Sequence, residues 1–372
     1  MRTRMTVVAP FRRLLSALLL LVALLAPSAT SAFAQGVSIG GPFEGEASAL
    51  TGSGATFPAP LYQKWFTEYA NLTHVQINYQ AIGSGGGIQG IQQKTVDFGA
   101  SDAPMNDDQL KAAAGPIFHI PTALGAIVPT YNVPEAASTQ LNFTADDLAG
   151  IFLGSIQMWN DPMLVTDNPV LANLDQPIVV VHRSDGSGTT FGFTDYLSKV
   201  SPDWQANVGK GTSVNWPVGL GASGNPGVAG EVQQDVYSIG YVELIYALQN
   251  NLGYGTVMNS SGNFVNPSLQ GVTAAAGSAA TVIPADLRFS IVNAPGADAY
   301  PISTATWLLV YRDMTDQSKG LALTRMLWWA THEAQRFNND LSYATVPAEI
   351  TARSEAYIRQ INVNGQPIFP GR

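Results

Sequence analysis

Short runs of β-branched and aromatic residues alternate along the chain with segments whose apolar residues recur every three or four positions. The strand-like runs are residues 75–79, 96–100, 126–131, 178–181, 238–242 and 306–311. Helical spacing occurs at Leu61, Trp65 and Tyr69, at Ile88 and Ile91, at Phe193, Tyr196, Leu197 and Val200, and at Leu323, Met326, Leu327 and Ala330. Strands that alternate with helices predict an α/β fold.

One stretch, residues 219–230, fits neither pattern. It contains five Gly residues and one Pro within twelve positions. Because Gly and Pro are the commonest breakers of regular structure, this stretch predicts a loop outside the cores.

The N-terminus carries the features of an export signal. Four Arg residues precede the apolar run 14–26, and the sequence Ala32-Phe33-Ala34 follows it. The apolar run has about 13 residues, fewer than the roughly 20 that a membrane-spanning helix needs. We therefore predict a signal peptide, residues 1–34, cleaved near Ala34, and a periplasmic or secreted mature protein. The small and Gly-rich residues 35–47 predict a flexible N-terminal lead.

Length and charge narrow the possible architectures and partners. Cleavage would leave about 338 residues, enough for two domains, and would change the formal net charge from −9 to about −13. An acidic surface disfavours nucleic acid and anionic lipid as partners. The chain has no Cys and only four widely spaced His residues, so the sequence predicts no metal site.

Three turns rich in Gly, Ser and Thr precede helical segments: residues 52–57, 83–87 and 185–190. Backbone N–H groups at a helix start are unpaired, and Gly lets an anion approach them closely. One such turn usually serves only as a helix cap, but three in one chain favour an anion site. Arg183 precedes the third turn and can donate to an oxyanion, with Asp185 orienting its guanidinium from behind.

These residues lie in blocks that resemble the phosphate-binding proteins of the bacterial high-affinity phosphate ABC transporter. The blocks are LTGSGATFPAPLYQKWF from residue 50, INYQAIGSGGGIQGI from 77, TVDFGASDAP from 95, DDLAGIFLGSIQMWND from 146 and VVHRSDGSGTTFGFTDYLSKVSPD from 180, followed by residues 208–225 and 239–243. They cover most of the mature chain.

The resemblance implies a two-domain periplasmic-binding-protein fold of type II, with the ligand in the interdomain cleft. The chain would cross between the domains twice, near residues 124 and 300. Domain I would comprise residues 48–124 and 301–372, and domain II residues 125–300. The implied protein is a non-enzymatic, monomeric solute-binding protein without a cofactor, which captures inorganic phosphate and delivers it to the membrane permease subunits of an ABC transporter.

The resemblance also implies the ligand residues. They are Thr56, Phe57, Ser84, Asp102, Arg183, Ser187, Gly188 and Thr189, with Asp185 behind Arg183. Asp102 would select the anion, because phosphate at neutral pH still carries a proton that a carboxylate can accept. Sulfate carries none, so its oxygen would leave the carboxylate unpaired.

Three other functions remain as alternatives. A secreted phosphoester hydrolase could use Ser187 or Ser84 as its nucleophile, although neither lies in a Gly-x-Ser-x-Gly motif and the nearby base is His182. The spacing Gly85-x-Gly87-x-x-Gly90 matches a dinucleotide fingerprint, but the acids that follow do not end a strand. A binder of another oxyanion, such as sulfate or molybdate, is disfavoured if Asp102 faces the ligand.

Overall fold

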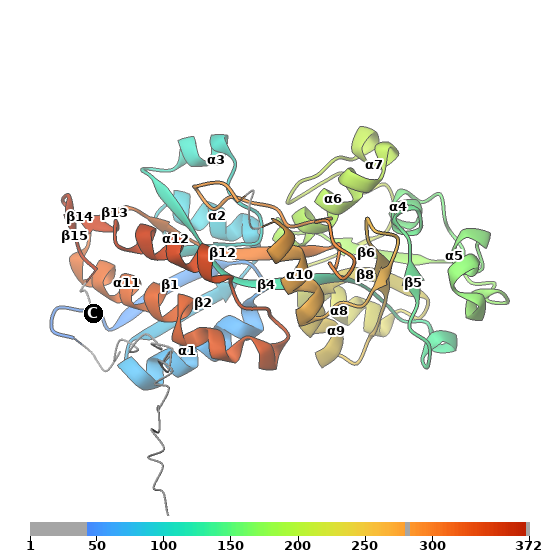
Figure 1. Ribbon diagram of the computed structural model, residues 1–372, viewed down its shortest axis with the longest axis horizontal. Coiled ribbons are helices and arrows are strands. Elements are labelled where there is room, and N and C mark those ends of the chain that lie inside the picture. Colours follow the sequence, from blue (N-terminus) through green and yellow to red (C-terminus); the bar gives the residue numbers. More distant parts are fainter. Residues whose placement is uncertain (1–42, 280–282, 370–372) are drawn as a thin grey trace, which may run out of the picture. The chain divides into compact units, whose positions relative to one another are not determined.

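A nine-stranded mixed sheet runs through the residues that the computed structural model describes, 43–279 and 283–369 (Figure 1). The predicted signal peptide lies outside these residues. The strands are β1 (Ala49–Gly54), β2 (Gln76–Ala81), β3 (Phe98–Ser101), β4 (Ile117–Tyr131), β6 (Val179–Arg183), β7 (Leu220–Ala222), β8 (Ser238–Glu243), β9 (Gly253–Tyr254) and β12 (Ser303–Tyr311).

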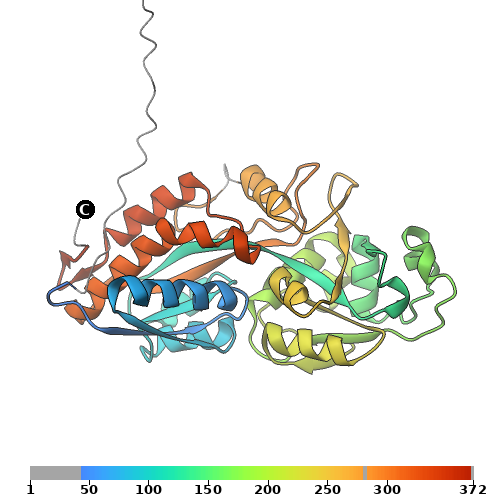
Figure 2. The same ribbon diagram turned by 90° about the horizontal axis from the view of Figure 1, so that it is seen from below.

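Two long strands occupy the centre of this sheet. The strand order is β2-β1-β3-β12-β4-β8-β6-β7, and β9 pairs with β4. The first part of β4, up to Ala126, pairs antiparallel with β12, whereas its last part, from Ile127, pairs antiparallel with β8. In Figure 2 the teal strand β4 runs from the half that contains the blue helix α1 to the half that contains the yellow helix α8. The same strand therefore belongs to both halves of the sheet.

Helices pack on both halves of the sheet. They are α1 (Ala59–Thr73), α2 (Ser84–Gln92), α3 (Asp107–Ala112), α4 (Ala145–Leu153), α5 (Pro162–Asp167), α6 (Gly188–Val200), α7 (Pro202–Asn207), α8 (Gly224–Gln234), α9 (Leu244–Gln249), α10 (Leu269–Ala279), α11 (Gln317–Thr331) and α12 (Ala348–Ile358). Helices α1, α2 and α11 contact the β1–β3 half, and α6 and α8 contact β8. Within the described ranges, every helix is too short or too polar to cross a bilayer.

Six short strands form two smaller sheets beside the main one. One contains β5 (Asn142–Phe143), β10 (Thr256–Met258) and β11 (Phe264–Val265), and the other β13 (Asp313–Met314), β14 (Asn362–Val363) and β15 (Gln366–Pro367). Neither sheet includes a predicted site residue.

The six strands and the four helices predicted from periodicity are confirmed. Each predicted strand overlaps one of β2, β3, β4, β6, β8 and β12, and the helical segments correspond to α1, α2, α6 and α11. The bounds differ most for β4, which begins nine residues before the predicted run 126–131. Pro121 and the polar residues His119 and Thr122 interrupt the apolar pattern in that first part, although it is buried almost throughout.

The first predicted turn, residues 52–57, is partly a strand, because β1 extends to Gly54. A Cβ atom at Gly52 would lie 2.2 Å from the Phe98 ring, and one at Gly54 would lie 2.0 Å from the Ala100 carbonyl oxygen. The close packing of β1 against β3 therefore requires these glycines, and the turn itself begins only at Ala55.

The prediction of a loop at residues 219–230 is wrong. The stretch contains β7 and the first seven residues of α8. Val228, Ala229 and Val232 are fully buried, and α8 packs on β8 and β6. Burial of this apolar stripe outweighs the low helix propensity of the glycines, because helical stability in proteins comes mostly from tertiary packing.

The last residues of the predicted N-terminal lead contact α11. The Ala47 N–H donates to the Ser318 carbonyl oxygen at 3.0 Å. The buried carboxylate of Glu46 pairs with the guanidinium of Arg325, which also lies over the Phe43 ring at 3.8 Å from its centroid. Residues 43–47 are thus held to the main body by specific contacts, and the earlier part of the lead lies outside the described residues.

Two Gly-to-Ala substitutions should have opposite effects, because Gly87 in α2 packs tightly on the sheet and Gly230 in α8 does not. A Cβ atom at Gly87 would lie 2.4 Å from the Ala100 carbonyl oxygen and 2.7 Å from the Gly54 Cα, whereas one at Gly230 would meet nothing within 4 Å. We expect Gly87→Ala to lower the free energy of unfolding by about 1–3 kcal/mol. The control Gly230→Ala should raise it by up to about 1 kcal/mol, because Ala favours the helix. Urea denaturation measures both, and equal effects would contradict this account of the packing.

Candidate functional site

The predicted site residues all lie where strands end and helices begin. Thr56 and Phe57 connect β1 to α1, Ser84 is the first residue of α2, and Asp102 follows β3. Arg183 ends β6. Ser187 is the N-cap of α6, and Gly188 and Thr189 are its first two residues. These positions come from both halves of the sheet, and hydrogen bonds bring them together.

The turns before α2 and α6 are in direct contact. The Gly85 N–H donates to the Gly186 carbonyl oxygen at 2.8 Å. A Cβ atom at Gly83 would lie 2.3 Å from the Asp185 carboxylate, and one at Gly85 would lie 3.1 Å from the Gly186 Cα. Glycine is therefore required at Gly83, both for this approach and for its φ of +90°.

Ser84 links the two helix starts to Asp102. Its hydroxyl oxygen accepts the Gly188 N–H at 3.0 Å and the Asp102 N–H at 3.1 Å. The hydroxyl proton points towards Asp102 Oδ2 at a long 3.4 Å. A Cβ atom at residue 188 would lie 2.5 Å from the Ser84 hydroxyl oxygen and 2.6 Å from Asp102 Oδ2, so only glycine fits there.

The Asp102 carboxylate is buried, with 1% of its surface exposed. Its Oδ1 atom is buried and accepts no hydrogen bond from the described residues. Burial raises the pKa of the Asp102 carboxyl to about 7, and the neighbouring Thr306 hydroxyl and Arg183 guanidinium act in the opposite direction. A buried carboxylate oxygen without a donor is costly, so this atom is poised to accept a proton from a ligand.

Arg183 is buried at the end of β6, where Asp185 holds its guanidinium. Its Nε donates to Asp185 Oδ1 at 2.7 Å and its Nη2 to Oδ2 at 2.5 Å. Asp185 Oδ1 also accepts the Gly224 N–H at 2.9 Å. Burial favours the neutral acid, but the hydrogen bond and charge of Arg183 keep the pKa of Asp185 below its usual value. The third nitrogen of Arg183, Nη1, is buried without an acceptor among the described residues.

Two tyrosines fix the turn that contains Thr56 and Phe57. The Tyr246 hydroxyl donates to the Thr56 carbonyl oxygen, and the Tyr343 hydroxyl donates to the Phe57 carbonyl oxygen, each at 2.6 Å. Tyr246 lies in α9 and Tyr343 follows α11, so distant segments hold the backbone of this turn. Both carbonyl groups are therefore turned towards these tyrosines.

The start of α6 is held by hydrogen bonds to its N-cap residue. The Ser187 hydroxyl oxygen accepts the Thr190 N–H at 3.0 Å, which is the usual N-cap bond. The Ser187 N–H donates to the Thr212 carbonyl oxygen at 2.8 Å. The next residues, Gly188 and Thr189, are buried beside Ser84 and Asn225.

Two further residues belong to this site but are absent from the sequence prediction. Asn225 in α8 contacts Thr56 and Thr189, and Thr306 in β12 is close enough to Asp102 to lower its pKa. The Thr306 hydroxyl is buried without a partner among the described residues. Asn225 stands in the stretch mistaken for a loop, and Thr306 in a strand whose pattern indicates only core. Buried polar side chains within apolar elements are the signal that could have found them.

The arrangement combines several buried hydrogen-bond donors with a buried, unpaired carboxylate acceptor. Backbone N–H groups at two helix starts, Arg183 Nη1 and several hydroxyl groups supply the donors. The acceptor is Asp102 Oδ1. Such a set is suited to a small oxyanion that carries one proton.

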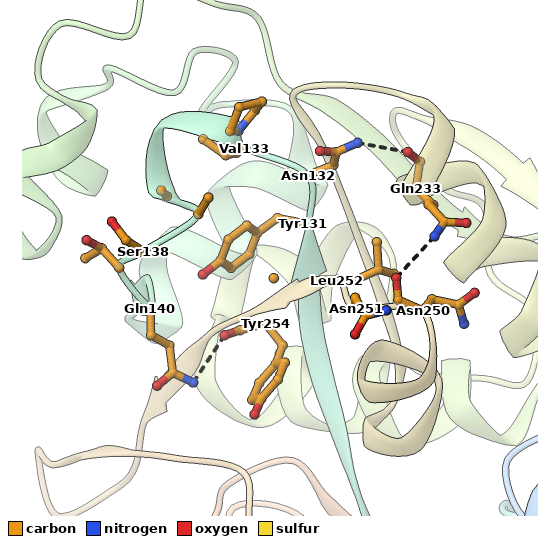
Figure 3. Close-up of a pocket in the computed structure, with 15 residues that line it drawn as sticks. Tyr131, Asn132, Val133, Ser138, Gln140, Gln233, Asn250, Asn251, Leu252 and Tyr254 are labelled. Carbon is orange, nitrogen blue, oxygen red and sulfur yellow. Dashed lines mark hydrogen bonds between the residues drawn. The ribbon is translucent and has the colours of Figure 1, made fainter.

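A separate surface pocket of about 720 Å³ lies beyond the end of β4 (Figure 3). Its amide side chains are largely paired with backbone groups within the pocket: Asn132 donates to the Gln233 carbonyl oxygen, Gln233 to that of Asn250 and Gln140 to that of Tyr254. None of the predicted site residues lines this pocket. It is distinct from the candidate site.

Comparison with known proteins places the chain in a family. Residues 29–324 match the model described as PBP superfamily domain. The phosphate-binding protein PstS of Xylella fastidiosa (strain 9a5c) is 43% identical over 308 residues, which cover 83% of this chain and 84% of that protein. The phosphate-binding protein PstS of Haemophilus influenzae is 44% identical over 309 residues, covering 82% of this chain and 91% of that protein.

Solved structures share the fold. A high-affinity periplasmic phosphate-binding protein bound with phosphate matches with a TM-score of 0.68 at 21% identity, over 83% of this chain and 93% of that one. The phosphate-binding protein from Stenotrophomonas maltophilia matches with a TM-score of 0.62 at 19% identity, over 83% of this chain and 94% of that one. The predicted α/β periplasmic-binding-protein fold is thus confirmed. The chain belongs to the PBP superfamily and, within it, to the family of phosphate-binding proteins PstS.

Proposed function

We propose that this chain is an extracytoplasmic solute-binding protein that captures inorganic phosphate and delivers it to the permease of an ABC transporter. The observation that carries the proposal is the buried Asp102 Oδ1, a carboxylate oxygen without a donor among the described residues that lies beside Ser84 and Gly188. The names of the relatives and the phosphate bound in a structural neighbour support the same ligand.

The proposed ligand residues supply donors to the phosphate oxygens. They are the hydroxyl and N–H of Thr56, the N–H of Phe57, the hydroxyls of Ser84, Ser187 and Thr189, the N–H groups of Gly188 and Thr189, and the guanidinium of Arg183. Two of these donors would have to change partner when phosphate binds, because the Gly188 N–H donates to the Ser84 hydroxyl oxygen and the Ser84 proton points towards Asp102 Oδ2. Arg183 Nη1 is the free donor of that guanidinium, since Asp185 occupies the other two nitrogens on its far side. The Thr306 hydroxyl, buried without a partner among the described residues, is a further candidate donor.

Asp102 distinguishes phosphate from sulfate. Phosphate at neutral pH retains a proton that can be donated to Asp102 Oδ1, whereas sulfate presents an oxygen without a proton. Because the carboxylate is almost fully buried, water cannot separate it from that oxygen. The resulting unpaired charge costs several kcal/mol, which disfavours sulfate by orders of magnitude.

Phosphate binding is coupled to closure of two domains. Domain I comprises residues 48–124 and 301–372, and domain II residues 125–300. The supporting observation is the change of partner within β4, from β12 up to Ala126 to β8 from Ile127. Bending of β4 and of the start of β12 would separate the two sets of ligand residues, and closure would bury the anion. The closed monomer then docks on the permease subunits in the periplasm or outside the cell.

The site lacks the features of a serine hydrolase. A serine nucleophile needs a base within hydrogen-bond distance. The His182 ring instead stacks on Trp216, with 4.9 Å between ring centroids, and its Nδ1 contacts the Arg183 carbonyl oxygen. The Ser187 hydroxyl caps α6. These contacts favour binding of phosphate over cleavage of phosphoesters, and phosphate is the only ligand that we propose.

We expect Asp102→Asn to reduce discrimination between phosphate and sulfate by at least about 100-fold. The amide can donate to sulfate but offers phosphate a poorer acceptor, so the two affinities should change in opposite directions. Calorimetry with each anion measures the ratio. Asp147→Asn is the matched control, because Asp147 is equally buried and also has an unpaired oxygen but lies in α4, outside the site. An unchanged ratio in Asp102→Asn would contradict the proposed role.

Burial raises the pKa of Asp102 to about 7, which predicts pH-dependent sulfate binding. Above this pH the ionised carboxylate repels sulfate, whereas below it the neutral carboxyl group can donate its own proton. We expect sulfate affinity to rise by up to roughly tenfold per unit as the pH falls towards about 7, and to level off below it, where the carboxyl group is already protonated. Calorimetry at pH values on both sides of the pKa measures this change. The pH dependence should disappear in Asp102→Asn. A wild-type sulfate affinity that does not change with pH would contradict the proposed role of the Asp102 carboxyl group.

We expect no turnover of a generic phosphoester such as p-nitrophenyl phosphate. The Ser187 hydroxyl caps α6, and the Ser84 hydroxyl accepts two backbone N–H groups and has its nearest base, Asp102 Oδ2, at a long 3.4 Å. Release of p-nitrophenol is followed by absorbance with the purified mature chain. Any hydrolysis that copurifies should be the same in Ser187→Ala as in the wild type. Turnover that Ser187→Ala abolishes would establish the hydrolase and refute a purely binding function.

A further inference from the structure

Asn225 is a fully buried polar residue near the start of α8 that joins both sides of the candidate site. Its backbone N–H and its side-chain Nδ2 both donate to the Thr56 hydroxyl oxygen, at 3.1 and 2.9 Å. The same Nδ2 donates to the Thr189 hydroxyl oxygen at 3.0 Å. Thr56 follows β1 and Thr189 lies in α6, so one side chain connects the two halves of the sheet.

The orientation of the Asn225 amide is determined by its other partner. Its Oδ1 accepts the N–H of Glu243 at 2.9 Å, at the end of β8. A backbone N–H can only donate, so the amide oxygen must face Glu243 and the NH₂ group must face the two threonines. The reverse orientation would place two donors against each other.

This orientation determines what the two threonine hydroxyls can do. A hydroxyl group has one proton to donate and two lone pairs that accept. Asn225 fills both lone pairs of the Thr56 oxygen, so this hydroxyl can act only as a donor towards a further partner. At Thr189 the same NH₂ group occupies one lone pair and likewise directs the proton away from Asn225.

We propose that Asn225 is a positioning residue that fixes the polarity of the Thr56 and Thr189 hydroxyls, so that both donate to the bound anion. The inference rests on the proposed phosphate-binding function and deepens it. With both hydroxyls committed as donors, Asp102 is left as the acceptor for the proton of phosphate. Without Asn225, each hydroxyl could rotate and present a lone pair to the anion, which weakens binding without removing any group that contacts the ligand.

A mutant cycle with phosphate calorimetry tests whether Asn225 acts through these hydroxyls. We expect Asn225→Ala to weaken phosphate binding about 10- to 100-fold. In a Thr56→Val, Thr189→Val background, the same Asn225→Ala substitution should change the affinity by less than about twofold, because the hydroxyls that it orients are gone. Independent losses that multiply in the triple variant would show a merely structural role and overturn the inference.

Two further variants control for folding. Asn259 is a buried residue outside the site, and its side-chain amide donates to the carbonyl oxygens of Gly296 and Ala299. Asn259→Ala should therefore lower the unfolding temperature and leave phosphate affinity unchanged. Asn225→Asp keeps the side-chain shape but replaces the NH₂ donor with an acceptor, so it should weaken phosphate binding at least as much as Asn225→Ala. If either Asn225 variant binds phosphate with wild-type affinity, the inference is overturned but the proposed function is not. A wild-type chain that binds no phosphate overturns the proposed function and the inference together.

Discussion

The direct contact between the turn before α2 and the turn before α6 holds the candidate site together. The Gly85 N–H donates to Gly186, and the Gly188 N–H donates to the Ser84 hydroxyl oxygen. At this distance a side chain at residue 188 would overlap Ser84 and Asp102. Glycine thus allows two helix starts to face the same small volume, and donors from both halves of the sheet converge on it.

Burial gives the few charges of the site their importance. Asp102 and Arg183 are almost fully buried, so their interactions are far less screened than those of surface charges. Asp185 takes two of the three guanidinium nitrogens, which leaves Arg183 as a directed donor more than as a free positive charge. The formal net charge of −9 does not prevent anion binding, because recognition depends on groups at contact distance.

The hydroxyl groups illustrate how polarity can be set by neighbours. Ser84 accepts two backbone N–H groups, and Thr56 accepts two donors from Asn225. In both cases the lone pairs are occupied and the proton is directed elsewhere. A proton on the ligand needs an acceptor, and hydroxyls that can only donate do not provide one. The ligand can therefore carry its proton next to Asp102 Oδ1. Specificity therefore depends on the surrounding hydrogen-bond network as well as on the groups that touch the anion.

Some of this was predictable from the sequence and some was not. The order of strands and helices follows from local periodicity, and the Gly-rich turns indicate helix starts with free donors. Asp102 was named only through a family resemblance, because an Asp before Ala and Pro looks like an ordinary turn residue. Asn225 was missed because the glycines around it suggest a loop, whereas burial of Val228 and Val232 makes this segment helical.

The sequence by itself determined the elements and the chemical groups at their ends, because periodicity, capping and turn formation act over a few residues. Only the tertiary structure decided which groups meet. Ser84 and Gly188 are 104 positions apart, and Thr56 and Asn225 are 169 apart. Contacts over such separations depend on the strand order of the sheet and on close packing at glycines, and no local pattern encodes them. The unpaired oxygen of Asp102 likewise exists only because the folded chain excludes water from it.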